Sequence, residues 1–376
     1  MSFAVLYLPL IGEFHGTRAE VAIVHSAVLL LGGLGSPMIG WAFDRLGPRR
    51  LFQYGAVIAA IGFILASRAS SLPELVLTYG IVGGFGLAML GSQANMIVAA
   101  LWYPANRGRA IALVDLGTGA GAFAFLPIAQ MLVERVGWRG VLLAWVALLV
   151  AVVVPLNAVQ KLPAAQRAPV GSHASSPPRW TLATALRAPS FWWLAAMRFC
   201  GACAFPVMNT HMVAYAIGQG IAAERAATAL GAVSLVSLLG RFSTGALSDR
   251  LGRAQTLTLA YGSAALGIAC LSMLSLRGAS WWLVLYVILY GLSQGSTGIV
   301  GSARAADIFA GPTFGSIFGW VALAIGPGEA FGAWVGGRIY DGTGSYLPAF
   351  GFVILALAGG VVAIWRVREP GRRPVG

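Results

Sequence analysis

The stretch that decides the fold is Gly40-Trp-Ala-Phe-Asp44-Arg45-Leu-Gly47-Pro-Arg49-Arg50, because its pattern occurs twice in the chain. The second copy, 205 residues later, reads Gly245-Ala-Leu-Ser-Asp249-Arg250-Leu-Gly252-Arg253. Each copy is a short polar interruption between two long apolar segments. Self-similarity at one long offset indicates two structurally related halves within a single chain.

The composition places these halves in a membrane. Of the 376 residues, 58% are hydrophobic and only 10% are charged, and the mean hydropathy is +0.79, whereas soluble domains carry about a quarter charged residues. The three Cys residues cannot form a disulfide framework. The net charge of +13 comes from basic residues between apolar segments rather than along one exposed face, which argues against a nucleic-acid partner. The sequence therefore predicts an all-α protein whose surroundings are a lipid bilayer.

Apolar segments long enough to cross a bilayer recur along the chain. A spanning helix needs about 20 mostly apolar residues, and eleven segments meet this requirement: 20–43, 51–69, 74–101, 110–133, 139–157, 191–217, 224–247, 256–276, 281–303, 315–337 and 347–366. A shorter apolar run covers residues 1–13, and the repeat offset places the start of its counterpart about 14 residues before Met1. We expect the first helix to be truncated in this chain. A secretory signal is the alternative, but the run lacks a basic n-region and a cleavage site.

The basic residues of the connections predict the orientation. Sixteen lie at one side of the predicted segments and seven at the other, and the positive-inside rule assigns the richer side to the cytoplasm. Residues 157–190 are then a cytoplasmic linker. The linker separates an N-terminal helix bundle at 1–156 from a C-terminal bundle at 191–376, and the C-terminus is also cytoplasmic.

The repeated stretch resembles the G-x-x-x-D-R-x-G-R-R/K signature of the major facilitator superfamily, with Pro48 where the first basic residue is usual. Three further stretches resemble the monocarboxylate and oxalate/formate group of that superfamily: Trp102-Tyr103-Pro-x-Asn-Arg107-Gly108-Arg-Ala, Gly137-Trp138-Arg139 and Asp341-x-Thr-Gly-Ser-Tyr346-x-x-Ala-Phe350. The resemblance implies two six-helix bundles related by a pseudo-two-fold axis. The fifth segment departs from the G-x-x-x-G-P-x-x-G-G pattern of drug–proton antiporters.

The signature also predicts a contact between helices. The carboxylate of Asp44 can lie against the positive N-terminal end of a neighbouring helix, and the resemblance implies the eleventh, which starts near Phe314-Gly315-Ser316. Such a contact acts as a conformational latch that favours one state. The predicted latch residues of the two copies are Gly40, Asp44, Arg45, Gly47, Asp249 and Arg250. Topology anchoring by the arginines, and tight packing or turning at the two glycines, are the alternative roles.

Arg241 is the embedded residue that best predicts a substrate. An arginine inside an apolar segment is costly unless it faces water or a counter-ion, and its planar fork matches a carboxylate. The resemblance places an anion-binding arginine at this position of the eighth helix, although Ser237 stands where proton-coupled members carry an acid. Snorkelling to the cytoplasmic interface is the alternative. The other predicted substrate-binding residues lie on the seventh segment: Arg198, Asn209, His211 and Tyr215.

Two embedded acids are candidates for proton coupling. Glu329 follows the Gly326-Pro327-Gly328 interruption of the eleventh segment, and Asp115 lies early in the fifth. Breaks of this kind are tolerated at membrane depth where they line a cavity. A structural pairing of Glu329 with Arg338 is an equally open interpretation.

The chain shows no nucleotide-binding, zinc-binding or nucleophile-elbow pattern, so we predict neither an enzyme, a cofactor nor a metal site. The sequence predicts a monomeric secondary transporter of the cell inner (plasma) membrane. It would move a small organic anion, a mono- or dicarboxylate, by alternating access, with protons as the candidate coupling ion. Transport of another small solute, drug efflux, and a non-transporting sensor are the alternatives.

Overall fold

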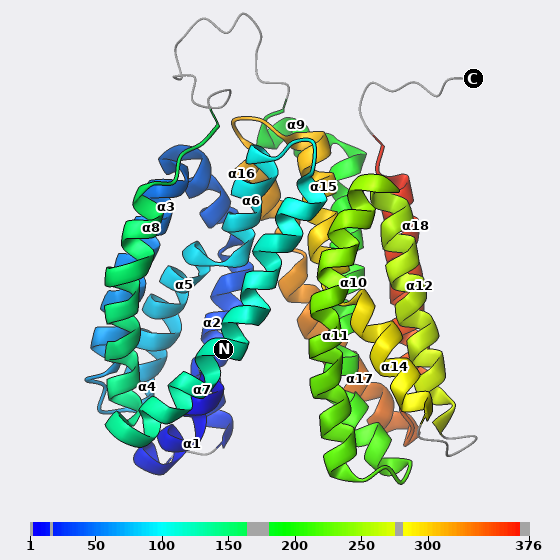
Figure 1. Cartoon of the computed structure of the whole chain (residues 1–376), viewed down its shortest axis with the longest axis horizontal. Helices are drawn as coiled ribbons and strands as arrows, with labels where there is room; N and C mark the ends of the chain where they lie inside the picture. Colours follow the sequence, from blue (N-terminus) through cyan, green and yellow to red (C-terminus); the bar gives the residue numbers. More distant parts are fainter. Residues whose placement is uncertain (1–2, 16–17, 164–179, 275–280, 369–376) are drawn as a thin grey trace, which may run out of the picture. The chain divides into compact units, whose positions relative to one another are not determined.

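The computed structural model describes residues 3–15, 18–163, 180–274 and 281–368, and within these ranges it contains helices and no strand (Figure 1). The first half of the sequence forms α1 (Phe3–Phe14), α2 (Arg18–Leu34), α3 (Ser36–Ala66), α4 (Leu72–Leu75), the π-helix η1 (Val76–Gly83), α5 (Gly84–Leu90), α6 (Ser92–Trp102), α7 (Arg107–Leu148), the π-helix η2 (Leu149–Val153) and α8 (Val154–Ala158). The second half forms α9 (Leu182–Arg187), α10 (Pro189–Gly218), α11 (Ala223–Arg250), α12 (Arg253–Ser272), α14 (Trp281–Ser293), α15 (Ser296–Phe309), α16 (Phe314–Ala322), α17 (Ile325–Thr343) and α18 (Leu347–Arg366).

The helices agree with the predicted spans. Among the described residues, nine helical stretches are long and apolar enough to cross a membrane, and two shorter apolar helices cover Val5–Phe14 and Ile23–Leu34. The predicted connection between the second and third segments is a break inside α3 at Gly47, where φ is +73°. The connection between the fifth and sixth segments is a similar break inside α7 at Gly137. The polar interruptions of the sequence therefore mark where the chain turns between spans.

The chain folds into two compact units that exchange short segments. Unit 1 comprises Met1–Trp102, Gly117–Arg179 and Gly311–Leu323. Unit 2 comprises Tyr103–Leu116, Trp180–Ala310 and Ala324–Gly376. Most of each unit comes from one half of the sequence, but α16 belongs to unit 1 and the first turns of α7 belong to unit 2. The division into bundles at 1–156 and 191–376 stays a prediction, and the centre of the linker, 164–179, lies outside the described residues.

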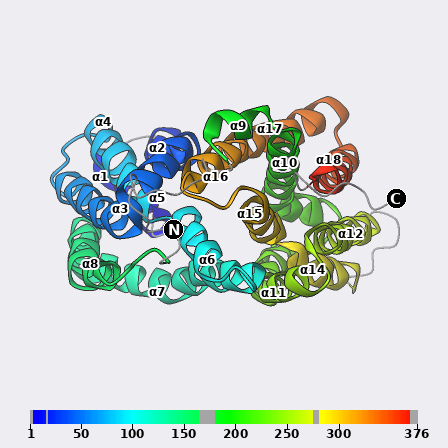
Figure 2. The same cartoon turned by 90° about the horizontal axis from the view of Figure 1, so that it is seen from above.

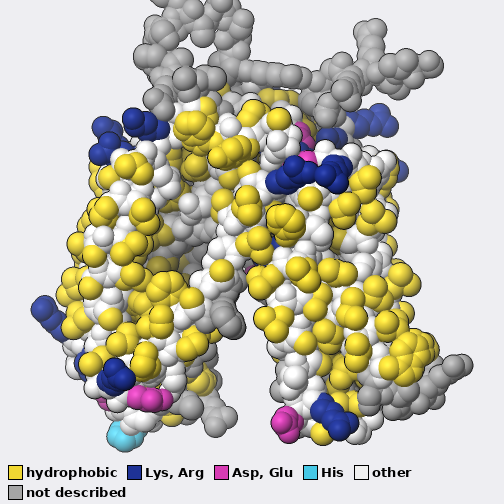
Figure 3. Space-filling view, in the orientation of Figure 1, with side chains coloured by type: hydrophobic (Ala, Val, Ile, Leu, Met, Phe, Trp, Pro, Cys, Tyr) yellow, Lys and Arg dark blue, Asp and Glu magenta, His cyan; other side chains and the backbone are white. Residues whose placement is uncertain are grey.

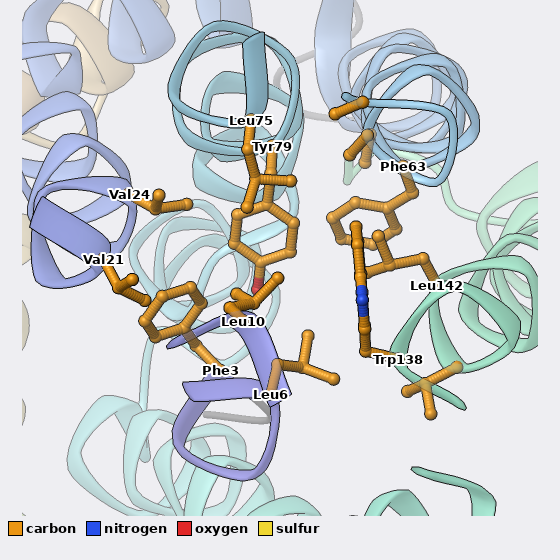
Figure 4. Packing of buried hydrophobic residues seen from close by; sticks show 14 of the residues in the cluster. Phe3, Leu6, Leu10, Val21, Val24, Phe63, Leu75, Tyr79, Trp138 and Leu142 are labelled. Atoms are coloured by element: carbon orange, nitrogen blue, oxygen red, sulfur yellow. The ribbon is translucent and has the colours of Figure 1, made fainter. Parts of the chain in front are cut away.

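The interior of unit 1 is apolar and aromatic (Figure 4). Tyr79 of η1 lies between Phe63 of α3 and Phe3 of α1, with ring centroids 5.4 and 5.7 Å apart. Trp138 joins this cluster from α7 and donates its indole N–H to Glu13. Because lipid offers no hydrophobic driving force between helices, close packing of this kind and such polar contacts hold membrane helices together.

In unit 2, α10 packs against both α17 and α18, while α14 packs against α11 and α12 (Figure 2). Tyr286 and Tyr290 of α14 stack at a centroid distance of 5.0 Å in the interior. The helical path from α14 to α15 is interrupted at Gln294 and Gly295. This interruption places Gln294 and Gly295 at the wall of a cavity within unit 2.

Candidate functional site

A cavity of about 280 Å³ lies within unit 2. It is lined by residues of α10, α11, the junction between α14 and α15, and α17. Its polar lining side chains are Arg198, Asn209, Arg241, Gln294, Thr297 and Glu329. A volume near the lower end of the range for ligand pockets suits a small solute.

Arg241 reaches this cavity from α11 and forms an ion pair with Asp115. Asp115 lies in the part of α7 that belongs to unit 2, and its side chain is 11% exposed, against 23% for Arg241. The guanidinium is thus directed to a counter-ion and to the cavity, as an embedded arginine requires.

The backbone at Gly295 makes room for the guanidinium of Arg241. Gly295 has φ of +84°, a conformation that L side chains rarely adopt. A Cβ built at Gly295 would lie 2.8 Å from Cγ and 3.2 Å from Cζ of Arg241. The break between α14 and α15 therefore turns the chain, and the backbone at this break packs against the side chain of Arg241.

Fixed hydrogen bonds hold the remaining polar groups around the cavity. Gln294 donates its Nε2 hydrogen to Oδ1 of Asn209 at 3.0 Å. The hydroxyl groups of Thr297 and Tyr261 lie 2.7 Å apart. These contacts join α10, α12 and the start of α15, so the polar groups of the lining are positioned before any solute arrives.

Arg198 and Glu329 complete the charges of the lining. Arg198 is 2% exposed and donates to Oγ of Ser302 at 2.7 Å. Glu329 is exposed at the cavity, and among the described residues it has neither an ion pair nor a hydrogen bond. The alternative pairing of Glu329 with Arg338 is thus not formed within the described part of the chain.

His211 and Tyr215 do not line the cavity, because only one face of α10 is turned toward it, and that face ends at Asn209. The ring of His211 lies 5.3 Å from that of Tyr346, and the hydroxyl of Tyr215 donates to the Ser272 carbonyl at 3.3 Å. Burial and the nearby Tyr340 and Asp341 raise the pKa of the Tyr346 phenol. A solute contact from His211 or Tyr215 stays a prediction.

The first copy of the repeated stretch holds α3 against α16 within unit 1. The oxygens of Asp44 accept hydrogen bonds from the backbone N–H of Gly315 at 2.7 Å, and from the N–H and hydroxyl of Ser316, both at 2.6 Å. Gly40 permits this approach, since a Cβ there would collide with the Gly315 carbonyl. The predicted contact of Asp44 with the start of the eleventh segment is therefore present, and its role as a latch stays a prediction.

The second copy holds α11 against the start of α7 within unit 2. Asp249 accepts hydrogen bonds from the backbone N–H groups of Gly108 and Arg109, each at 2.9 Å. It also pairs with Arg253 at 2.7 Å. Arg253 and Arg107 both pair with Asp307, at 2.9 and 2.8 Å. Asp249 thus belongs to a network of charges, whereas Asp44 is held by neutral donors.

Several residues of these sites were not predicted from the sequence as site residues. They are Arg107, Arg253, Asp307, Ser316, Gln294 and Thr297. Arg107 and Arg253 lie inside stretches that the sequence analysis recognised as family motifs, so their positions in these motifs could have marked both as site residues. Gln294 lies inside the predicted segment 281–303 and Asp307 in the connection that follows it. Neither belongs to a recognised motif, so only the fold shows their partners.

The polytopic helical fold, the paired helix contacts and the charged cavity define a multi-pass membrane protein with a polar cavity inside one helical unit. The chain belongs to the Major Facilitator Superfamily, whose family profile matches residues 1–303. Monocarboxylate transporter 13 of Rattus norvegicus is 26% identical over 368 residues, with 96% of this chain and 84% of the relative covered. Monocarboxylate transporter 3 of the same species is 30% identical over 369 residues, covering 96% and 73%. The fucose:proton symporter FucP of E. coli shares the fold, with a TM-score of 0.73 at 19% identity over 98% of this chain and 95% of that structure.

Proposed function

We propose that the protein is a secondary active transporter that moves a small carboxylate anion across the cell inner membrane by alternating access. The observation that carries this proposal is the guanidinium of Arg241, which lies at the wall of a small cavity and has a carboxylate, Asp115, as its partner. The similarity to monocarboxylate transporters at 26% and 30% identity supports the same class of solute.

Arg241 would bind the solute by exchanging the carboxylate of Asp115 for the carboxylate of the solute. A guanidinium forms two parallel hydrogen bonds with a planar carboxylate, which is a geometry that few neutral solutes can match. The contact with Asp115 demonstrates that a carboxylate can reach Arg241 in this fold. The solute would take the place of Asp115, while Asn209 and Gln294 hydrogen-bond its other polar atoms.

Displacement of Asp115 provides a route to proton coupling. Two carboxylates close together beside one cation cannot both stay ionised without a cost, so one of them takes up a proton. Asp115 would accept that proton when the solute anion arrives. Glu329, which also lines the cavity, is the second candidate proton carrier.

The latch residues would control the conformational cycle. The contacts made by Gly40, Asp44, Gly245 and Asp249 stabilise one arrangement of helix ends, and alternating access requires these contacts to form and break in turn. Exposed Arg45 and Arg250, next to the two carboxylates, would stay on the cytoplasmic side, as the charge asymmetry of the sequence predicts.

Substitution of Arg241 tests the proposal. In proteoliposomes we expect Arg241→Gln to abolish uptake of radiolabelled lactate, pyruvate, oxalate or formate, whichever the wild type transports. Arg241→Lys keeps the charge but loses the fork, so we expect it to weaken binding by about 1 to 3 kcal/mol. Uptake of each anion should be measured with and without a pH gradient.

Arg338→Gln, which removes an arginine from α17 outside the cavity lining, is the matched control. Each variant should be compared at equal amounts of folded protein. Full activity of Arg241→Gln would overturn the proposed anion site. Binding of the anions without net uptake by the wild type would instead favour the sensor alternative.

A further inference from the structure

Four basic side chains of unit 1 are exposed and gather around the break in α3. They are Arg45, Arg49 and Arg50 of α3 and Lys161, which follows α8, and together they are called the α3 basic surface. Among the described residues none of the four forms an ion pair. Figure 3 shows Lys and Arg side chains gathered at this end of α3 and α8.

The fold holds Lys161 beside the turn of α3. The turn bends at Gly47, and a Cβ built there would lie 4.0 Å from Cδ1 of Leu162. The indole N–H of Trp102 donates to the carbonyl of Lys161 at 2.8 Å. The segment after α8 is therefore fixed next to α3, and its lysine adds to the charge of the three arginines.

Among the described residues of unit 1, no acidic side chain pairs with these four basic side chains. Asp44 is the acid of the turn, and its oxygens are already occupied by Gly315 and Ser316 of α16. The other acids of unit 1 belong to connections at the opposite ends of these helices: Glu13, Glu20, Glu74 and Glu134. The α3 basic surface therefore attracts an anion from outside the chain.

Two tryptophans indicate that this anion belongs to a lipid. Trp41 is 50% exposed and Trp102 is 46% exposed, and both lie beside the basic residues. The guanidinium of Arg45 lies 4.9 Å from the centroid of the Trp41 ring. Tryptophan prefers the boundary between headgroups and acyl chains, so an anion at this level is a phosphate that carries acyl chains.

We propose that the α3 basic surface binds the headgroup of an anionic phospholipid such as phosphatidylglycerol. Arg49 and Arg50 contact the phosphate and Lys161 lies at its edge, while Trp41 and Trp102 contact the glycerol and the first acyl carbons. The site is separate from the solute cavity, because it lies in unit 1 and shares no residue with the cavity lining.

Lipid retention measured by native mass spectrometry tests this site. Full-length protein is exchanged into mixed micelles with equal amounts of phosphatidylglycerol and phosphatidylcholine. We expect wild type to retain phosphatidylglycerol preferentially. The double variant Arg49→Gln/Arg50→Gln should lose affinity for it by about 30-fold, since each basic side chain near an anionic surface contributes roughly fivefold. Arg68→Gln, an exposed arginine just beyond the other end of α3, is the matched control and should retain the lipid.

Two further arms make the result decisive. Glycerol phosphate without acyl chains should not compete with phosphatidylglycerol for the site. Rising salt should release phosphatidylglycerol from wild type, and this second test does not depend on the folding of a variant. Equal retention by the double variant and wild type, or an equal loss in Arg68→Gln, overturns the site. Competition by free glycerol phosphate shows a phosphate site rather than a lipid site, and it overturns the proposal as well.

Discussion

Under the proposed function, Asp115 and a carboxylate solute would compete for the same guanidinium, because Arg241 lines the cavity and already pairs with Asp115. The two residues are 126 positions apart and lie on different helices, α7 and α11. Protonation of Asp115 would release Arg241 for the solute. Affinity for the anion should therefore rise as the pH falls, as long as the solute itself stays ionised.

Replacing Asp115 by Asn tests this competition. The amide is neutral and leaves Arg241 open, so we expect the apparent affinity for the anion at neutral pH to rise by about tenfold, the effect of one charged hydrogen bond. The rise in affinity on acidification should disappear. Initial rates of uptake at acidic and neutral pH measure both effects. Glu134→Gln, an exposed acid on the same helix, should behave like wild type, and an Asp115→Asn variant that keeps the wild-type pH dependence would contradict the competition.

Gly295→Ala tests the backbone that supports Arg241. The new methyl group would meet the side chain of Arg241, and alanine at φ of +84° is strained by about 1 to 2 kcal/mol. We expect a lower melting temperature together with weaker anion binding. Gly262→Ala is the matched control, since a Cβ there meets nothing within 4 Å and Gly262 does not line the cavity. Equal thermal shifts in the two variants would show that the position of Gly295 has no special role.

At the scale of helices, the two copies of the repeated stretch are not equivalent. Each presents a glycine for close approach and a carboxylate for the N-terminal end of another helix. However, Pro48 occupies in the first copy the position of Arg253 in the second. Asp44 is consequently held by neutral N–H and hydroxyl donors, whereas Asp249 shares Arg253 with Asp307.

This difference predicts unequal effects of removing each carboxylate. Asp44→Asn should weaken the contact of α3 with α16 by about 1 kcal/mol, the size of a charge at a helix terminus, and shift the population toward conformations in which that contact is open. Asp249→Asn should cost more, because it also takes a partner from the partly buried Arg253. Accessibility of single cysteines to reagents from each side reports the populations. Unchanged accessibility in Asp44→Asn would exclude a latch role for Asp44.

The helices could be predicted from the sequence, but apart from the contact of Asp44 with the start of the eleventh segment their partners could not. Hydropathy gave 191–217 where the structure has Pro189–Gly218, and 347–366 where it has Leu347–Arg366, because one span is a local property of about 20 residues. The break at Gly295 lay hidden inside the predicted segment 281–303, since glycine is common in membrane helices. The pairing of Arg241 with Asp115 depends on which helices are neighbours in the fold. A local sequence pattern does not contain that information.

At the scale of the whole chain, the distribution of basic residues predicts a single orientation. We expect a fluorescent reporter fused after Gly376 to be active in the cytoplasm of a bacterial host, because cytoplasmic loops carry the excess of Lys and Arg. A periplasm-specific phosphatase fused after Ser70, in the connection that follows α3, should be active. The inverse pattern of the two reporters would show that the charge asymmetry does not set the orientation of this protein.

The exchange of segments between the units imposes an order on biogenesis. Unit 1 includes Gly311–Leu323, which is translated long after the other segments of that unit. Until then, Asp44 lacks the N–H groups of Gly315 and Ser316 that later bind it. An N-terminal half made alone would leave this carboxylate and the surface of α3 at Gly40 without their partners in α16. We therefore expect such a half to be less stable than the full chain, because the contact of α3 with α16 cannot form in it.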